Sequence, residues 1–347
     1  MAPRAAFQIG EELVQAGQRK TVDLPVSVLS DHTPVTMSVH VIHGRRNGPT
    51  VFVSSSVHGD EIIGVEIVRR LLRTRNLQTL RGTLMVVPIV NTFGFINHSR
   101  YLPDRRDLNR SFPGSNKGSL AARLANLFLT EVVERCELGF DLHSAAIHRT
   151  NLPQIRVSPK NPELLRLGRR FGAPVVLTSP IREGSLRAAA AEKGVNVLLY
   201  EAGEGLRFDE FAVRAGVAGI LRVLNEMGMI STKGITKPKA ASQICSSSRW
   251  IRAQAGGLLR SFRREGDIVK KNELLAAISD PFGEVELEIR SPSNGLIIGR
   301  TVLPIVNEGD AIFHLASVRS ETTAEAALED IAAHLEADPL FDEDEII

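Results

Sequence analysis

Two histidines and a glutamate are spaced in this sequence as the ligands of a catalytic metal ion would be. His58 and Glu61 follow the β-rich run Thr50–Val53, and His143 follows a second apolar run. Residues three apart share one face of a helix, so both side chains can reach one ion if a helix begins near Asp60. Two imidazoles and a carboxylate are the ligand set of a catalytic zinc, whose fourth position stays open to water or a substrate oxygen. The spacing therefore predicts a metal-dependent hydrolase.

The pair His58 and Glu61 is a weak signal by itself, because a histidine before a helix more often caps the helix or lies exposed. The combination with His143 carries more weight. Sites in open α/β folds lie at the carboxyl edge of the sheet, and both histidines follow strands that can reach that edge.

The loop Asp107–Gly114 places an amide donor, Asn109, next to a guanidinium, Arg110. Together these groups can grip a carboxylate, because the planar guanidinium gives two parallel charge-assisted bonds and the amide adds a third. The alternative is that Arg110 makes an internal ion pair or lies in solvent, which is the commoner state of an arginine.

An apolar strand over Val195–Leu199 runs toward Glu201, which is a candidate general base beside a metal-activated water. Glu204 is the rival. Glu201 is favoured because it lies at the predicted strand end, where the backbone is well fixed, whereas Glu204 falls in a loop flanked by glycine.

The elements that must position these residues alternate as in an α/β layered domain. Strands are predicted at Val35–Ile42, Thr50–Val53, Thr83–Ile89, Leu138–Leu142, Ile155–Val157, Pro174–Leu177 and Val195–Leu199. Helices are predicted at Glu61–Arg73, Ser119–Glu134, Leu164–Phe171 and Phe211–Met227. The polar stretch Ser231–Arg249 is typical of a connector, and the short strands and glycine turns beyond it predict a small all-β module.

The bulk composition is that of a globular protein with 43% hydrophobic and 24% charged residues. No apolar stretch near the N-terminus resembles a signal peptide, and none is long enough for a bilayer, so a cytoplasmic protein is expected. Cys136 and Cys245 lie outside any CxxC pattern and are expected to be small buried fillers. Residues 320–347 hold ten acids and no Lys or Arg, which leaves the preceding residues net basic. Scattered arginines and few aromatics favour a small anionic substrate over nucleic acid.

Four motifs in order resemble those of the succinylglutamate desuccinylase/aspartoacylase family, a branch of the zinc carboxypeptidase-like enzymes. They are His58–Glu61, Asp107–Gly114, Asp141–His143 and Glu201–Gly203, spread over most of the first 200 residues. The resemblance implies an α/β fold with a carboxypeptidase-like mixed sheet flanked by helices. One departure is Ala202, which stands where the family usually has leucine after the glutamate and could change the wall beside it.

The same resemblance implies roles for particular residues. It implies one zinc ion per subunit bound by His58, Glu61 and His143, with Glu201 as the base. Asn109 and Arg110 would hold the carboxylate of an N-acyl amino acid, and Arg156 would border the pocket. Arg100 is similar to the family arginine that stabilises the oxyanion, although extra residues separate it from Asn109, so Arg105 and Arg106 remain competitors.

The C-terminal segment Ala255–Leu315 resembles a biotinyl/lipoyl-type barrel-sandwich. In that alignment Glu284 takes the place of the modified lysine, and a carboxylate cannot carry biotin or lipoate by the usual amide. The module is therefore interpreted as a former carrier fold that caps the site or mediates assembly. The expected domains are residues 1–235 (catalytic), 236–318 (β module) and 319–347, an acidic tail whose Ala-rich part, Glu321–Glu336, has helical composition.

The sequence leaves several alternatives open. A metallocarboxypeptidase acting on short peptides would use the same zinc and Asn-Arg arrangement, and a non-catalytic binding protein is the alternative outside enzymology. Succinyl, acetyl and longer acyl groups all fit the pattern, with an acetylated diamino acid among the candidates. Whether identical subunits form a homo-oligomer is also left open.

Overall fold

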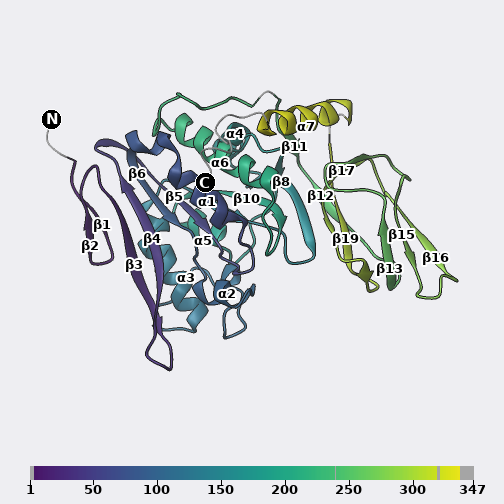
Figure 1. The fold of residues 1–347 in the computed structure, drawn as a ribbon, viewed down its shortest axis with the longest axis horizontal. Coiled ribbons are helices and arrows are strands. Elements are labelled where there is room, and N and C mark those ends of the chain that lie inside the picture. The colour runs from purple at the N-terminus through teal and green to yellow at the C-terminus, as the bar shows by residue number, and fades with distance from the viewer. Residues whose placement is uncertain (1–3, 239, 319–320, 337–347) are drawn as a thin grey trace.

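The computed structural model describes residues 4–238, 240–318 and 321–336 (Figure 1). Its main feature is a mixed 13-stranded sheet in which ten strands follow the order β12-β19-β17-β8-β10-β7-β5-β6-β4-β3. The strands of its N-terminal part, residues 1–235, are β3 (Arg19–Val28), β4 (Pro34–His43), β5 (Arg46–Ser55), β6 (Arg81–Val87), β7 (Leu138–His143), β8 (Arg149–Val157), β9 (Val175–Thr178) and β10 (Asn196–Glu204). A separate two-stranded sheet pairs β1 (Phe7–Ile9) with β2 (Glu12–Val14).

Four neighbouring strands, β6, β5, β7 and β10, run parallel to one another. Parallel strands end at the same edge of a sheet, so the residues that follow β5 and those that end β7 and β10 are brought together there. All six residues of β7 are buried, as expected for a strand with both faces covered.

Helices cover both faces of the sheet (Figure 1). One apolar cluster joins the sheet to α1 (Ile63–Arg73), α4 (Pro162–Phe171) and α6 (Glu210–Glu226). A second cluster on the other face includes residues of α3 (Leu120–Glu131) and α5 (Leu186–Glu192). A short helix, α2 (Thr92–Ile96), follows β6. The mixed α/β sheet with flanking helices is the predicted fold class.

The strands and helices predicted for residues 1–235 are all present, with two local corrections. Helix α1 begins at Ile63 rather than near Asp60, so His58 and Glu61 lie in the turn before it. Strand β10 continues to Glu204, because β8 pairs with it beyond Glu201. Glu204 is thus a strand residue and not a loop residue.

The C-terminal strands divide between two sheets. Strands β12 (Ser248–Arg252), β14 (Ile268–Val269), β17 (Gly295–Thr301) and β19 (Ala311–Ala316) belong to the large sheet. Strands β13 (Gly257–Ser261), β15 (Leu274–Ser279), β16 (Glu286–Arg290) and β18 (Ile305–Val306) form a second, four-stranded sheet. Both sheets contribute to one apolar cluster. The predicted boundary near residue 235 stays a prediction.

The segment expected to be a connector also joins the main sheet. Residues Gln243–Cys245 form β11, which pairs in parallel with β9. The polar composition of Ser231–Arg249 concealed this strand, since three residues are too few for a periodic pattern.

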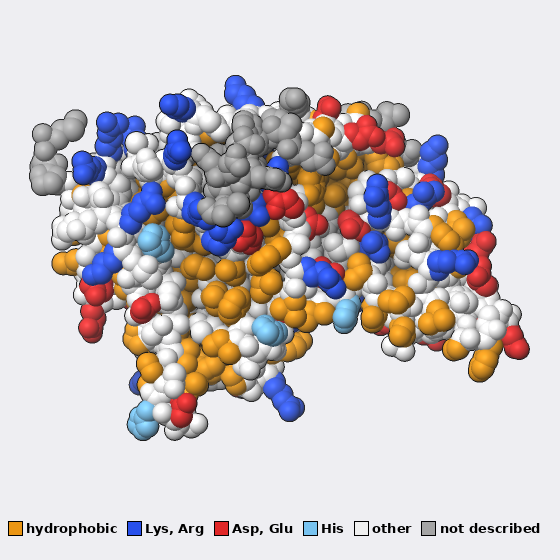
Figure 2. Space-filling view, in the orientation of Figure 1, with side chains coloured by type: hydrophobic (Ala, Val, Ile, Leu, Met, Phe, Trp, Pro, Cys, Tyr) orange, Lys and Arg blue, Asp and Glu red, His pale blue; other side chains and the backbone are white. Residues whose placement is uncertain are grey.

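The Ala-rich part of the tail forms α7 (Glu321–Glu336), which packs against α6. The side chains of Ala324, Ala327, Ile331 and Leu335 are buried, and Arg214 of α6 donates to the Leu335 carbonyl oxygen. The acidic run Asp342–Glu345 lies outside the described residues. No helix in the described part of the chain is both long and apolar enough to cross a bilayer. Figure 2 shows basic side chains scattered over one face, with acids among them.

Both cysteines should be unreactive in the native protein. Cys136 and Cys245 are buried and unpaired, and burial raises the pKa of both thiols, that of Cys245 to about 11. Because the thiolate is the reactive form, we expect no rapid reaction with Ellman's reagent at neutral pH and reaction of both thiols in guanidinium chloride. A rapidly modified thiol in the folded chain would contradict this placement.

Candidate metal and substrate site

The turn before α1 places His58 and Glu61 close together without a helix. The Glu61 amide donates to the His58 carbonyl oxygen at 3.1 Å, which closes a tight turn. Gly59 is needed here because a Cβ at this position would lie 1.9 Å from the backbone carbon of Gly94. The glycine of the motif therefore allows the turn to pack against α2, and the packing fixes both side chains.

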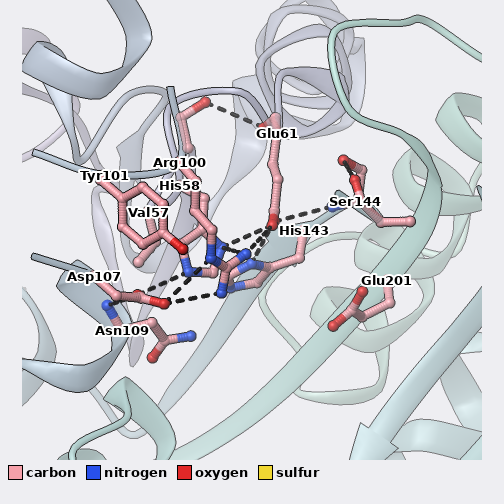
Figure 3. A network of polar contacts seen from close by, with 12 residues as sticks. Val57, His58, Glu61, Arg100, Tyr101, Asp107, Asn109, His143, Ser144 and Glu201 are labelled. Carbon is pink, nitrogen blue, oxygen red and sulfur yellow. Dashed lines mark hydrogen bonds and ion pairs between the residues drawn. The ribbon is translucent and has the colours of Figure 1, made fainter. Parts of the chain in front are cut away.

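The three predicted ligands converge on one point (Figure 3). Glu61 lies between the two imidazoles: Oε1 is 2.7 Å from His58 Nδ1, and Oε2 is 2.6 Å from His143 Nδ1. One ligand atom from each residue lies within 4.8 Å of the others, and all three residues are buried. Two histidines, one after β5 and one at the end of β7, thus meet at Glu61, and the three predicted ligands lie together.

Each imidazole ring has one aspartate at the nitrogen that faces away from Glu61. His58 Nε2 lies 3.1 Å from Asp107 Oδ1, and His143 Nε2 lies 2.8 Å from Asp141 Oδ2. A carboxylate behind a histidine fixes the ring and leaves the opposite nitrogen for a metal, which is the usual arrangement around metal-binding histidines. Both aspartates stand in the sequence motifs, but their roles were not predicted. Asp141 precedes His143 by two residues in β7, so strand alternation places both side chains on one face and could have indicated this contact. Asp107 comes from a distant loop, and the sequence gives no sign of its contact with His58.

The acidic and basic groups of this buried cluster stabilise one another's charged forms. Burial opposes the charged forms, yet the carboxylates of Glu61 and Asp107 raise the pKa of His58, and those of Asp141 and Glu61 raise the pKa of His143 well above its usual value. Burial likewise raises the pKa of Glu61, but the two imidazoles outweigh it and hold that pKa well below its usual range.

These shifts fit a site for a divalent cation. When both imidazoles are protonated, a divalent ion that displaces the two ring protons leaves the net charge of the cluster unchanged. Two histidine nitrogens and a carboxylate are also the donor set that zinc accepts in catalytic sites. The residues present therefore suit such an ion.

Of the three competing arginines, Arg100 is the one brought to this cluster. Its guanidinium lies 3.2 Å from Glu61 Oε1 and 3.0 Å from Asp107 Oδ2. Arg105 and Arg106 lie exposed on the following loop, where Arg106 pairs with Asp104 at 3.6 Å.

Glu201 lies directly beside His143, because the two residues are register partners in the parallel pair β10–β7. Its Oε2 accepts a 2.9 Å bond from Asn151 Nδ2, and its Oε1 lies 3.3 Å from Arg156 Nη1. The rival Glu204 is occupied elsewhere: its carboxylate accepts from the His148 amide and pairs with Arg207.

Asn109 and Arg110 differ in how they are placed. Asn109 Oδ1 accepts a 2.9 Å bond from the Leu186 amide at the start of α5, which orients its Nδ2 as the group left for a ligand. Arg110 is exposed, and its guanidinium donates to the carbonyl oxygen of Asn109. Ala202, which stands where the family usually has leucine, is buried in the apolar cluster that joins the sheet to α1, α4 and α6.

Arg187 of α5 is a further cation that the sequence did not single out. Its Nη1 is buried and has no hydrogen-bond partner among the described residues. Burial and the nearby Arg156 lower its pKa to about 10, against the attraction of Glu201 and Asp141. It stays cationic at neutral pH. No motif marks this residue, and only the packing of α5 against β10 places it here.

The fold and the cluster define an α/β protein with a candidate metal site at the carboxyl edge of a mixed sheet. The model of the succinylglutamate desuccinylase/aspartoacylase catalytic domain matches residues 47–227, more than half of the sequence. The chain belongs to this family.

Similar proteins extend the match over most of the chain. It is 25% identical over 313 residues to the N-alpha-acetyl-L-2,4-diaminobutyric acid deacetylase of Halomonas elongata, covering 87% of this chain and 92% of that one. A succinylglutamate desuccinylase of Pseudomonas aeruginosa is 31% identical over 133 residues, which are 35% of this chain and 39% of the relative.

Solved structures share the fold. The ectoine utilization protein EutE (DoeB) from Ruegeria pomeroyi superposes with a TM-score of 0.78 at 23% identity, over 87% of this chain and 95% of that one. A succinylglutamate desuccinylase/aspartoacylase from Rhodobacter sphaeroides gives 0.77 at 24% identity, with the same coverage.

Removing one histidine should abolish tight metal binding. His143→Ala deletes one of three ligands and leaves Glu61 and Asp141 unneutralised, so we expect loss of the bound ion after zinc loading and dialysis, measured by mass spectrometry of the metal content. His40→Ala, a histidine of β4 away from the cluster, is the control and should keep the wild-type content. One equivalent of zinc in the folded His143→Ala protein would show that the ligand set is wrong.

Proposed function

We propose that this chain is a zinc-dependent deacylase that hydrolyses the amide bond of a small anionic N-acyl amino acid. The observation that carries the proposal is the register of β7 and β10, which sets Glu201 beside His143. A candidate proton acceptor thus neighbours a candidate metal ligand. The names of the relatives, a deacetylase and a desuccinylase, support the same reaction class.

His58, Glu61 and His143 would hold the zinc ion. When bound, zinc lowers the pKa of water from about 15.7 to about 7 and polarises a carbonyl oxygen, which is the chemistry that amide hydrolysis needs. Asp107 and Asp141 keep both imidazoles oriented toward that position.

Glu201 would accept the proton of the attacking water and deliver it to the leaving nitrogen. Asn151 and Arg156 hold one carboxylate oxygen each, so the group is fixed before substrate arrives. Arg100 would donate to the oxyanion that forms on the acyl carbon, and this interaction is stronger in the transition state than with the planar amide. The products are a carboxylic acid and an amino acid.

The substrate carboxylate would bind near Asn109 and Arg110. Asn109 is already oriented by its bond to Leu186, whereas Arg110 is exposed and its guanidinium donates to the carbonyl oxygen of Asn109. Arg156 and the unpaired nitrogen of Arg187 add positive charge on the side of Glu201, which favours an anionic ligand.

The names of the relatives suggest which acyl group and which amino acid the substrate contains. An acetylated diamino acid is the first candidate, because the deacetylase of Halomonas elongata matches this chain over nearly its whole length. N-succinylglutamate is the second candidate. The test is hydrolysis of a panel of N-acetyl and N-succinyl amino acids by zinc-loaded protein. Faster release from short peptides than from any acylated amino acid would favour a carboxypeptidase instead.

The C-terminal strands are proposed to be a barrel-sandwich of the biotinyl/lipoyl type that no longer carries a cofactor. Two sheets around a shared core support this reading. Glu284, at the position of the carrier lysine, lies exposed in the hairpin between β15 and β16 and is tied by its amide to Asp280.

Glu201→Gln should remove activity while keeping the site intact. The amide preserves the shape but cannot take the proton, so kcat should fall about 100- to 10,000-fold with the zinc content unchanged. The matched control is Glu204→Gln, the same substitution in the rival residue, which should keep near wild-type kcat. Activity lost in the control and kept in Glu201→Gln would transfer the role to Glu204.

A further inference from the structure

Both oxygens of Glu201 are held from a single neighbouring strand. Asn151 and Arg156, which contact Oε2 and Oε1, both belong to β8. Glu201 itself is mostly buried, with 15% of its side chain exposed. Its orientation therefore depends on where β8 places these two partners.

Strand β8 also joins the strands that carry the candidate site to the C-terminal strands. It pairs with β10 on one side and with β17 on the other. Between β8 and β17, Asn151 is the register partner of Gly299, and Gln154 donates to the Ile298 carbonyl oxygen at 3.2 Å.

Gly299 makes room for the Asn151 side chain. A Cβ at Gly299 would lie 2.6 Å from Asn151 Oδ1, closer than non-bonded atoms can approach, and 3.1 Å from the Thr150 carbonyl oxygen. Gly299 does not have a positive φ, so its backbone conformation does not call for glycine. Glycine is needed here because there is no room for a Cβ atom.

The orientation of the Asn151 amide follows from its partner. A carboxylate only accepts hydrogen bonds, so Nδ2 must face Glu201 and Oδ1 must face Gly299. Any group that pushes Oδ1 rotates the amide and draws Nδ2 away from the carboxylate.

We propose that Gly299, a residue of the C-terminal strands, is a positioning residue for Glu201 and acts through Asn151. This inference rests on the proposed role of Glu201 as the base. It gives the C-terminal strands a part in catalysis that requires no contact between them and the substrate.

The first test follows the Asn151 side-chain amide directly by NMR of the full-length, metal-free protein labelled with 15N-asparagine. The resonance is identified by its loss in Asn151→Ala. Gly299→Ala should shift it in the same direction as Glu201→Gln, because in both variants Nδ2 no longer donates to a charged carboxylate. The control Gly256→Ala, where the nearest atom to a new Cβ is 3.5 Å away, should leave it in place.

The second test is kinetic. Gly299→Ala should lower kcat about 10- to 100-fold with KM and zinc content unchanged, since the base is misplaced while substrate and metal sites stay intact. Asn151→Ala should give a similar loss. The double variant should be no worse than Asn151→Ala alone, because residues that act in series are not additive.

Other outcomes would overturn the proposal. An unshifted amide resonance in folded Gly299→Ala, or losses in kcat that multiply in the double variant, would mean that Gly299 does not act through Asn151. If Gly299→Ala fails to fold, removal of the clashing side chain in the double variant should restore folding, and failure to do so would also refute it. If wild-type protein hydrolyses no acylated amino acid, the proposed function fails, while the NMR experiment still decides the positioning claim.

Discussion

The buried carboxylate of Glu61 is the group on which the whole site depends. A carboxylate removed from water is strongly destabilising unless charged partners and hydrogen bonds compensate it. Here His58, His143, Arg100 and the amide of Ser144 all meet its two oxygens. These partners come from separate segments, so Glu61 can be buried only when the sheet, the turn before α1 and the loop carrying Arg100 are all assembled.

The parallel arrangement of the central strands makes that assembly possible. His58 follows β5, His143 ends β7, and Glu201 lies in the next strand, β10. This much could be predicted from the sequence, since β-branched runs mark the strands and the polar residues stand at their carboxyl ends. The start of α1 was misplaced because the first residues after β5 form a tight turn, whose cause is the contact between Gly59 and Gly94.

What the sequence could not supply is pairing between distant segments. Asp107 was visible in a motif, but its contact with His58 depends on how two distant segments pack. Arg187 had no signal, because a single arginine in an Ala-rich helix is ordinary until that helix lies against β10. The pairing of β11 with β9 was hidden in a polar segment for the same reason: local periodicity does not report which strand will be a neighbour.

The same limit applies to the boundary between the catalytic and C-terminal parts. The family model ends at residue 227, yet the sheet continues past it through β17, β19 and β12. β9 pairs with residues 154–157 of β8 and β17 with residues 149–151, so without β17 the first part of β8 would expose unpaired backbone groups, and Gln154 would lose its bond to Ile298. Strand β8 also carries Asn151 and Arg156, the two residues that contact the candidate base Glu201. The strand that positions this base is therefore bonded to residues about 150 positions later in the chain. The sheet that carries the candidate site is therefore completed by the C-terminal strands, although the motifs all lie within the first two thirds of the sequence.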